Sequence, residues 1–355
     1  MTKVAVTGST GLIGTALVAS LRADGHEVVR LVRRAPQAPG EVRWDPRSMD
    51  AGLGSAEALH GVTACVHLAG AGVAGRRWTK RYKAEVEASR VLGTRALATA
   101  LARLDPLPAV LVSASAIGFY GSNTGADEQS PAGSGFLPGV VREWEAAADP
   151  ARSAGIRVVH PRSGLVMSAD GGVLAKFLPL ARPPLLPVSL CPRFGSGTQF
   201  MSWISLTDEI RAIRFLIDQD IAGPVNLTAP SPVTNAAFAQ TLSKAIGRRD
   251  LPWLRVPAPV LRLGMGEASV ELLSSSRVSP TRLAEHGFDF LHPTLTEALT
   301  AELTNVGAAR VTLRGPAEAP GGAAVGPFTP PVGNCGICPC LSHAKDVAGL
   351  FRVRT

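Results

Sequence analysis

The stretch Lys3-Val-Ala-Val-Thr-Gly-Ser-Thr-Gly-Leu-Ile-Gly14 decides the fold of this chain. Residues 3–7 are apolar and β-branched, which is typical of a buried parallel strand, and a segment of helical period follows the glycines. Glycines at this spacing allow a tight turn, close approach of a pyrophosphate and close helix packing. An ordinary strand-to-helix turn is the alternative. We expect a dinucleotide site formed by Gly8, Ser9, Thr10, Gly11, Leu12, Ile13 and Gly14.

The second expected strand, residues 27–32, ends at Arg33 and Arg34. An NAD-specific site usually carries an acidic residue there, about 20 residues beyond the glycine turn, which binds the ribose 2′-hydroxyl. Guanidinium groups instead pair with a 2′-phosphate through several donors. The alternative is a solvated basic strand end. We therefore expect NADP(H) as the cofactor, with Arg33 and Arg34 at its 2′-phosphate.

Composition narrows the class of protein. The chain has 355 residues, of which 46% are hydrophobic, but no apolar run reaches the length of a membrane span. The N-terminus lacks a secretory pattern, and only Cys65 and Cys191 precede residue 335, as in a reduced compartment. The net charge of +8 is scattered, without a recognised nucleic-acid-binding module. We expect a cytoplasmic protein with a small-molecule substrate and neither a nucleic-acid nor a membrane partner; the oligomeric state stays open.

Strand and helix patterns alternate beyond the glycine turn. This alternation predicts a Rossmann-type, doubly wound parallel sheet, whose ligands bind at the carboxyl ends of the strands. At that edge we expect the cofactor to meet Leu68, Ala69 and Gly70. Further strands are expected at 42–44, 62–69, 109–115 and 156–160, and helices at 78–103 and 139–153. The expected domains are 1–165 for NADP(H), 166–303 as a smaller substrate-side region, and 304–355 as a tail.

Several motifs resemble those of the extended short-chain dehydrogenase/reductases: Gly8-x-x-Gly11-x-x-Gly14, His67-Leu-Ala-Gly70 and Ser113-Ala-Ser115-Ala-Ile-Gly-Phe-Tyr120-Gly121. More narrowly, the chain resembles the "epimerase family protein" group, which is related to nucleotide-sugar epimerases and carries a C-terminal domain of unknown function. The narrower motifs are Arg77-Trp-Thr-x-x-Tyr82-Lys83, Trp144-Glu-Ala-Ala147, Pro161-Arg-x-Gly164 and Gly195-Ser-Gly-x-Gln199-x-x-x-Trp203-Ile204. The resemblance covers residues 1 to about 303 and implies the same fold, but it does not fix the substrate.

The catalytic positions depart from the superfamily. The resemblance implies a serine after the fifth strand and a Tyr-x-x-x-Lys helix some 25 residues on, in which the tyrosine transfers a proton and the lysine lowers its pKa. Ser115 matches the serine, but the helix that should carry the pair, residues 136–145, has neither tyrosine nor lysine. Tyr120 is the substitute candidate for the proton donor, and the alternative is a half-buried aromatic that closes the loop.

Two function classes follow, beside the alternative of a non-redox enzyme that uses the fold alone. The first is an NADP(H)-dependent, epimerase-like oxidoreductase that acts on a sugar-like or carbonyl substrate, such as a nucleotide sugar, with Ser115 and Tyr120 as catalytic residues. The second is an NADPH-binding sensor or scaffold that has lost catalysis, which the missing Tyr-x-x-x-Lys favours. Either class binds the dinucleotide at the same sheet edge.

Two segments differ from the family pattern. Four prolines between Arg182 and Phe194 argue against a helix there. Residues 304–355 are rich in Pro, Gly and Ala, a composition that predicts disorder, and we suspect an altered reading frame near residue 304. The spacing of Cys335, Cys338, Cys340 and His343 would permit zinc, but it is unusually tight, so we expect no metal.

Overall fold

The computed structural model describes residues 2–47, 59–73 and 76–313, with side chains described as far as residue 304. By its internal contacts the chain divides into two units, Met1–Val306 and Gly307–Thr355. All of the sheets and every candidate site residue belong to the first unit. The predicted tail and its cysteine–histidine cluster lie outside the described residues, except for the start of the tail.

A parallel sheet of eight strands organises the first unit, in the order β13-β8-β5-β4-β1-β2-β3, with β6 paired to β8. Every pair in it is parallel. The strands are β1 Lys3–Thr7, β2 Glu27–Val32, β3 Glu41–Arg43, β4 Ala64–His67, β5 Val110–Ser113, β6 Ser115–Ala116, β8 Arg157–Ser163 and β13 Gly223–Leu227. The predicted Rossmann-type parallel sheet is confirmed.

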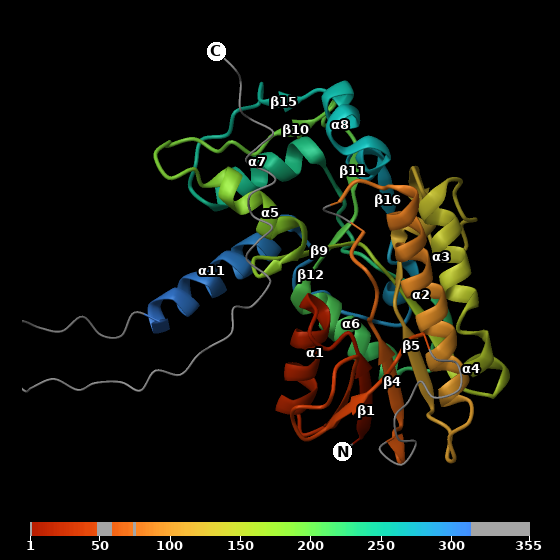
Figure 1. Ribbon diagram of the computed structural model, residues 1–355. Coiled ribbons are helices and arrows are strands. Elements are labelled where there is room, and N and C mark those ends of the chain that lie inside the picture. The colour runs from red at the N-terminus through yellow and green to blue at the C-terminus, as the bar shows by residue number, and fades with distance from the viewer. Residues whose placement is uncertain (1, 48–58, 74–75, 314–355) are drawn as a thin grey trace, which may run out of the picture. The chain divides into compact units, whose positions relative to one another are not determined.

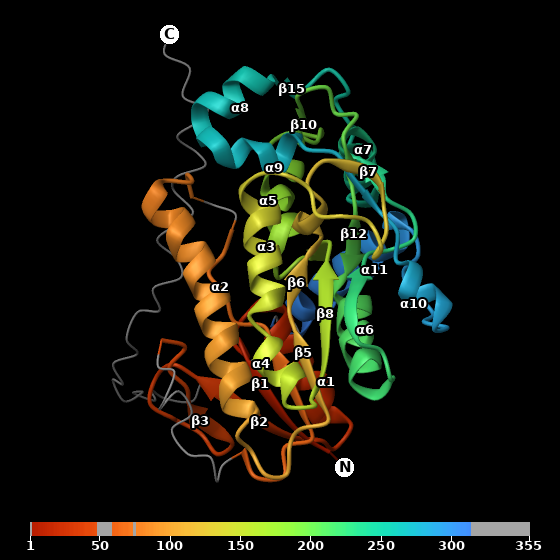
Figure 2. The ribbon, with the colours of Figure 1, turned by 90° about the vertical axis from the view of Figure 1, so that its right-hand side faces the viewer.

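Helices cover both faces of this sheet (Figures 1 and 2). On one face Val4 and Val6 pack in a core with Leu17 of α1 and Ile213 of α6. Because successive strand residues point to opposite faces, Ala5 enters the other core, under α2. The helices are α1 Leu12–Ala23 and α6 Leu206–Asp218 on the first face, and α2 Lys80–Leu101, α3 Phe136–Ala146 and α4 Asp149–Ser153 on the second. The doubly wound arrangement follows.

Two expected elements are divided in the structure. The helix expected at 139–153 starts earlier, at Phe136, and breaks before Asp149-Pro150, because proline cannot continue the preceding helix. The strand expected at 109–115 ends at Ser113, and Ser115 begins a separate strand that pairs with β8. Because of this second break, Ser115 pairs beside β8 at the carboxyl edge and does not continue β5.

The smaller region lies beyond the carboxyl edge of the sheet (Figure 1). Its core includes Trp203, Phe238 and Leu299. The region contains four two-stranded sheets, β10-β15, β11-β14, β12-β9 and β16-β7. Its elements are β7 Asn123–Ala126, β9 Leu165–Ser168, α5 Gly172–Ala181, β10 Arg193–Phe194, β11 Phe200–Met201, β12 Trp203–Ser205, β14 Val233–Thr234, α7 Asn235–Ala245, β15 Arg255–Val256, α8 Ala258–Met265, α9 Val270–Leu273, β16 Ser276–Val278 and α11 Leu295–Leu313. Helix α10, Thr281–Glu285, packs instead against β13 of the main sheet.

The proline-rich segment after α5 contains no helix before β10 begins at Arg193, as its sequence predicts. Helix α11 instead differs from expectation, because it continues past residue 303 to Leu313. Adding residues to a helix that has already formed costs less than starting one, which allows α11 to continue through this stretch. Within the described residues, no helix is long and apolar enough to cross a membrane.

Candidate functional site

The β1–α1 turn is built around the packing of its glycines. Gly8 has a φ of +64°, and a Cβ on it would lie 2.7 Å from the carbonyl carbon of Leu68. A Cβ on Gly14 would lie only 2.2 Å from the carbonyl oxygen of Gly8. Any side chain at either position would therefore force the turn away from β4 or from α1. The turn packs directly against the end of β4, as the glycine spacing predicts.

The start of α1 is free to receive a ligand. Gly11 is the N-cap residue and supplies no side-chain cap, and both Thr10 and Gly11 are exposed. A Cβ on Gly11 would meet only the Gly8 carbonyl oxygen, at 3.3 Å, so its absence leaves space on the solvent side of the turn. Uncapped amides and the helix dipole favour an anion at this position. These residues fit a dinucleotide diphosphate.

Thr7 and His67 fix the neighbouring loop at the end of β4. The Thr7 hydroxyl oxygen accepts from the amides of Leu68 and Ala69, at 3.1 and 3.2 Å. Its hydrogen is therefore free to be donated to Nδ1 of His67, at 2.7 Å, which leaves the imidazole proton on Nε2. Burial lowers the pKa of His67 to about 4. His67 is thus a neutral residue that holds the loop, and Gly70 stays exposed beside it.

Arg33 and Arg34 lie exposed at the end of β2, where the sequence places them. Arg34 donates to both carboxylate oxygens of Glu41, each at 2.7 Å. Hydrogen bonds from Arg34 and from the Gln37 amide lower the pKa of Glu41 to about 2. Arg30 also contacts Glu41, at 3.1 Å, and donates to the Ser9 hydroxyl at 3.1 Å. Sequence reasoning missed this carboxylate, which orients Arg34 and is linked through Arg30 to Ser9 of the glycine turn.

Ser115 belongs to a buried charged cluster. Its hydroxyl donates to Oε1 of Glu145, on α3, across 2.6 Å. Arg162, on β8, binds the same carboxylate through Nε and Nη2, both at 2.8 Å. Burial alone would raise the pKa of Glu145, but the hydrogen bonds and charge of Arg162 outweigh it and lower the pKa. Glu145 is therefore held ionised next to Ser115.

Tyr120 belongs to the same cluster and is only 2% exposed. Its hydroxyl donates to Oδ1 of Asn226 at 2.7 Å and accepts from Nη1 of Arg162 at 2.8 Å. Burial raises the pKa of Tyr120 above its usual value. The tyrosine is more deeply buried than the half-buried aromatic of the alternative interpretation, and its hydroxyl both donates and accepts within the protein.

Glu145 and Arg162 were overlooked as site residues, although both stand in motifs of the family pattern. The signal was an arginine inside a strand that is otherwise buried, because a charged side chain there requires a partner. Its partner comes from the position that follows Trp144 on α3. One member of the cluster, Glu145, therefore comes from the helix that lacks the tyrosine–lysine pair.

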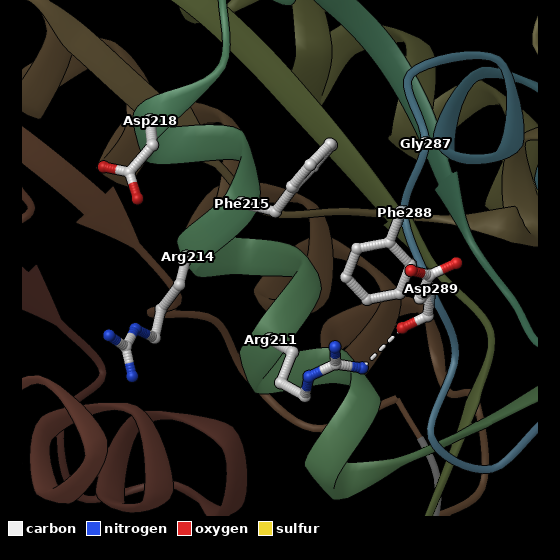
Figure 3. A pocket seen from close by; sticks show the side chains of 7 residues that line it. All are labelled: Arg211, Arg214, Phe215, Asp218, Gly287, Phe288 and Asp289. Atoms are coloured by element: carbon white, nitrogen blue, oxygen red, sulfur yellow. Dashed lines mark hydrogen bonds between the residues drawn. The ribbon is translucent and has the colours of Figure 1, made fainter.

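A surface pocket lies on α6 (Figure 3). It is lined by Arg211, Arg214, Phe215, Asp218 and Gly287–Asp289. Arg211 pairs with Asp208 at 3.0 Å, and Arg214 pairs with Asp24. None of the predicted cofactor or catalytic residues lines this pocket, and we assign the site to the carboxyl edge of the sheet.

The fold, the glycine turn and the edge residues together define a dinucleotide-binding protein of the Rossmann class. The sequence pattern of the NAD dependent epimerase/dehydratase family matches residues 4–227, and that of a domain of unknown function, DUF1731, matches residues 256–302. The chain belongs to the NAD dependent epimerase/dehydratase family.

Three relatives illustrate this membership. An epimerase family protein of Mycobacterium bovis, Mb2239, is 44% identical over 308 residues, which are 86% of this chain and 98% of the relative. The crystal structure of human epimerase family protein SDR39U1 with NADPH has a TM-score of 0.75 and 33% identity, covering 85% of this chain and 99% of that one. A nucleoside-diphosphate sugar epimerase from Corynebacterium glutamicum has a TM-score of 0.69 and 32% identity, covering 90% of this chain and 62% of that one.

Proposed function

We propose that this chain binds NADP(H) across the carboxyl edge of its main sheet. The observation that carries the proposal is the β1–α1 turn, in which Gly8 and Gly14 pack without room for a side chain while Gly11 leaves the helix start open. Arg33 and Arg34 would hold the 2′-phosphate, and Leu68–Gly70 would border the middle of the cofactor. The human relative with NADPH in its structure supports the same choice of nucleotide.

The proposed reaction is hydride transfer between the nicotinamide and a sugar-like or carbonyl substrate. The bound cofactor supplies the hydride chemistry. Ser115 stands at the edge of the sheet, and its only hydroxyl hydrogen is donated to Glu145. Toward a ligand the Ser115 oxygen is therefore a hydrogen-bond acceptor, suited to a substrate hydroxyl. The Arg162–Glu145 pair would keep the serine in this orientation.

The proposed reaction also requires a proton donor. Tyr120 remains our candidate, but to reach a substrate its hydroxyl would have to exchange its bonds to Asn226 and Arg162.

A nucleotide sugar remains the proposed substrate class, supported by the name of the Corynebacterium relative. The loop that contains Gln199 has a structural role, because the side-chain amide of Gln199 donates to the carbonyl oxygens of Phe194 and Leu272.

A second function, an NADPH-binding sensor or scaffold, is favoured by one specific observation. Helix α3 carries no Tyr-x-x-x-Lys, and Tyr120, the candidate replacement, is buried. Such a protein would bind the cofactor tightly and turn over nothing. Its cofactor contacts would be the same, so affinity alone does not separate the two functions.

Measured turnover distinguishes the enzyme from the sensor or scaffold. The full chain is incubated with NADPH or NADP⁺ and a panel of nucleotide sugars and carbonyl compounds, while nicotinamide absorbance and products are followed. The enzyme proposal expects conversion of at least one compound, reduced by Ser115→Ala without loss of NADPH affinity. Tight NADPH binding with no conversion across the panel would favour the sensor.

A further inference from the structure

Arg90 of α2 lies against the loop that borders the proposed cofactor. Its Nη1 donates to the carbonyl oxygens of Ala71 and Val86, at 2.9 and 3.1 Å. A Cβ on Gly70 would meet the Arg90 guanidinium carbon at 3.5 Å, so the two are in direct contact range. On its other side the guanidinium lies 4.9 Å from the centre of the Trp144 ring. Arg90 is thus held between the end of β4 and helix α3.

The charge on Arg90 has no acidic partner within the described ranges. Ala71 and Val86 supply only neutral carbonyl oxygens, and both are bound by the same nitrogen. Burial lowers the pKa of Arg90 from its usual value, yet a guanidinium keeps its charge at neutral pH. A half-buried cation without a counter-charge is held away from part of its hydration, so an anionic ligand beside it would be favoured.

The sheet order indicates which anion reaches this position. Strand β4 adjoins β1, whose glycine turn fits a diphosphate, while β2 with its terminal arginines lies on the far side of β1. Arg90 also packs on Trp144 of α3, the helix that lacks the lysine of related enzymes. We propose that Arg90 binds the diphosphate of the dinucleotide. This inference rests on the proposed NADP(H) site.

Binding of NADPH and NADH to the full chain tests the proposal. Arg90→Gln is expected to weaken both dinucleotides by about 10- to 100-fold, the range for a lost charge-assisted hydrogen bond. The ratio of the two affinities should stay unchanged, because both carry the same diphosphate. Arg95→Gln removes the same charge from an exposed position of α2 and should leave both affinities unaltered. Arg90→Lys keeps the charge and should restore most of the affinity.

The outcomes are distinct. If folded Arg90→Gln binds both dinucleotides like the parent, Arg90 only braces the loop and the inference is wrong. It is also wrong if NADPH alone is weakened, since that would place Arg90 at the 2′-phosphate. Should Arg90→Gln fail to fold, the Arg90→Lys variant decides. A loss of affinity smaller than tenfold for both dinucleotides supports the proposal, and a larger loss contradicts it. A parent protein that binds neither dinucleotide would instead refute the proposed function.

Discussion

The Ser115 hydroxyl donates to Oε1 of Glu145 across 2.6 Å, from a residue thirty positions away along the chain. The same carboxylate is bound twice by Arg162, whose side chain is 4% exposed. This arrangement makes Ser115 an acceptor toward any ligand and places an ion pair directly behind it. The residues of the cluster should therefore be coupled in stability as well as in function.

Glu145→Gln is expected to lower the free energy of unfolding by about 3–5 kcal/mol, because it leaves the Arg162 charge buried without a counter-charge. Ser115→Ala removes only one hydrogen bond and should cost about 1–2 kcal/mol. Urea unfolding of the full chain measures both. Combining Glu145→Gln with Arg162→Gln should cost clearly less than the two single changes added together. Strict additivity would show that the pair is not coupled.

Tyr120→Phe should lower the free energy of unfolding by about 1–3 kcal/mol, since it leaves polar groups of Asn226 and Arg162 without their partner. NADPH affinity should be unchanged. If Tyr120 is also the proton donor, turnover on an identified substrate will fall by about 10²–10⁴-fold in fully folded protein. Full turnover in this variant would remove Tyr120 from the proposed catalytic residues.

Gly11→Ala and Gly14→Ala should separate cofactor binding from folding. At Gly11 the nearest atom to a new Cβ is 3.3 Å away, so stability should change by no more than about 1 kcal/mol while NADPH affinity falls at least tenfold. At Gly14 the Cβ would lie 2.2 Å from a backbone oxygen, and the loss of stability should reach at least about 3 kcal/mol. Calorimetric melting and NADPH titration check both. A fully stable Gly14→Ala protein would contradict the packing described for the turn.

Glu209, in the first turn of α6, should make stability depend on pH. Its side chain is buried and accepts from the Ser163 hydroxyl at 2.6 Å, and burial raises its pKa from 4.5 to about 7. Between these two values the native protein holds a proton that the unfolded chain releases. The contribution of Glu209 is therefore fully present below pH 4.5 and falls as the pH rises to about 7.

Glu209→Gln removes this dependence, because the amide does not titrate. Relative to the parent, the variant should gain up to about 3 kcal/mol of stability as the pH rises through that window. Urea unfolding at a series of pH values gives the difference. Glu285→Gln, at an exposed position of α10, is the matched control for charge removal. A stability difference between parent and Glu209→Gln that is flat with pH would show that Glu209 has an ordinary pKa.

The sequence predicted the sheet well because each strand is a short apolar run bounded by glycine or polar residues. The glycine turn was also predictable from the local sequence, because only glycine fits the contacts at positions 8 and 14. The break between β5 and β6 was not predictable, since it depends on Ser115 leaving β5 to pair with β8. Local sequence patterns do not reveal with which neighbouring strand the end of a strand will pair.

The candidate site was predicted only in part. Ser115 and Tyr120 were identified, but their hydrogen-bond partners come from distant segments of the chain. Glu41 is likewise remote from the pattern that singled out Arg34, although its carboxylate fixes that arginine. Pairings across the fold depend on tertiary packing, which one sequence does not disclose.

The central claim, an NADP(H) site at the carboxyl edge, is tested most directly by the dissociation constants of the parent protein for NADPH and NADH. We expect NADPH to bind more tightly, and Arg33→Ala combined with Arg34→Ala to erase most of that preference, by about 1–3 kcal/mol. NADH affinity should be nearly the same in both proteins. Equal affinity of the parent for the two dinucleotides would contradict the assignment.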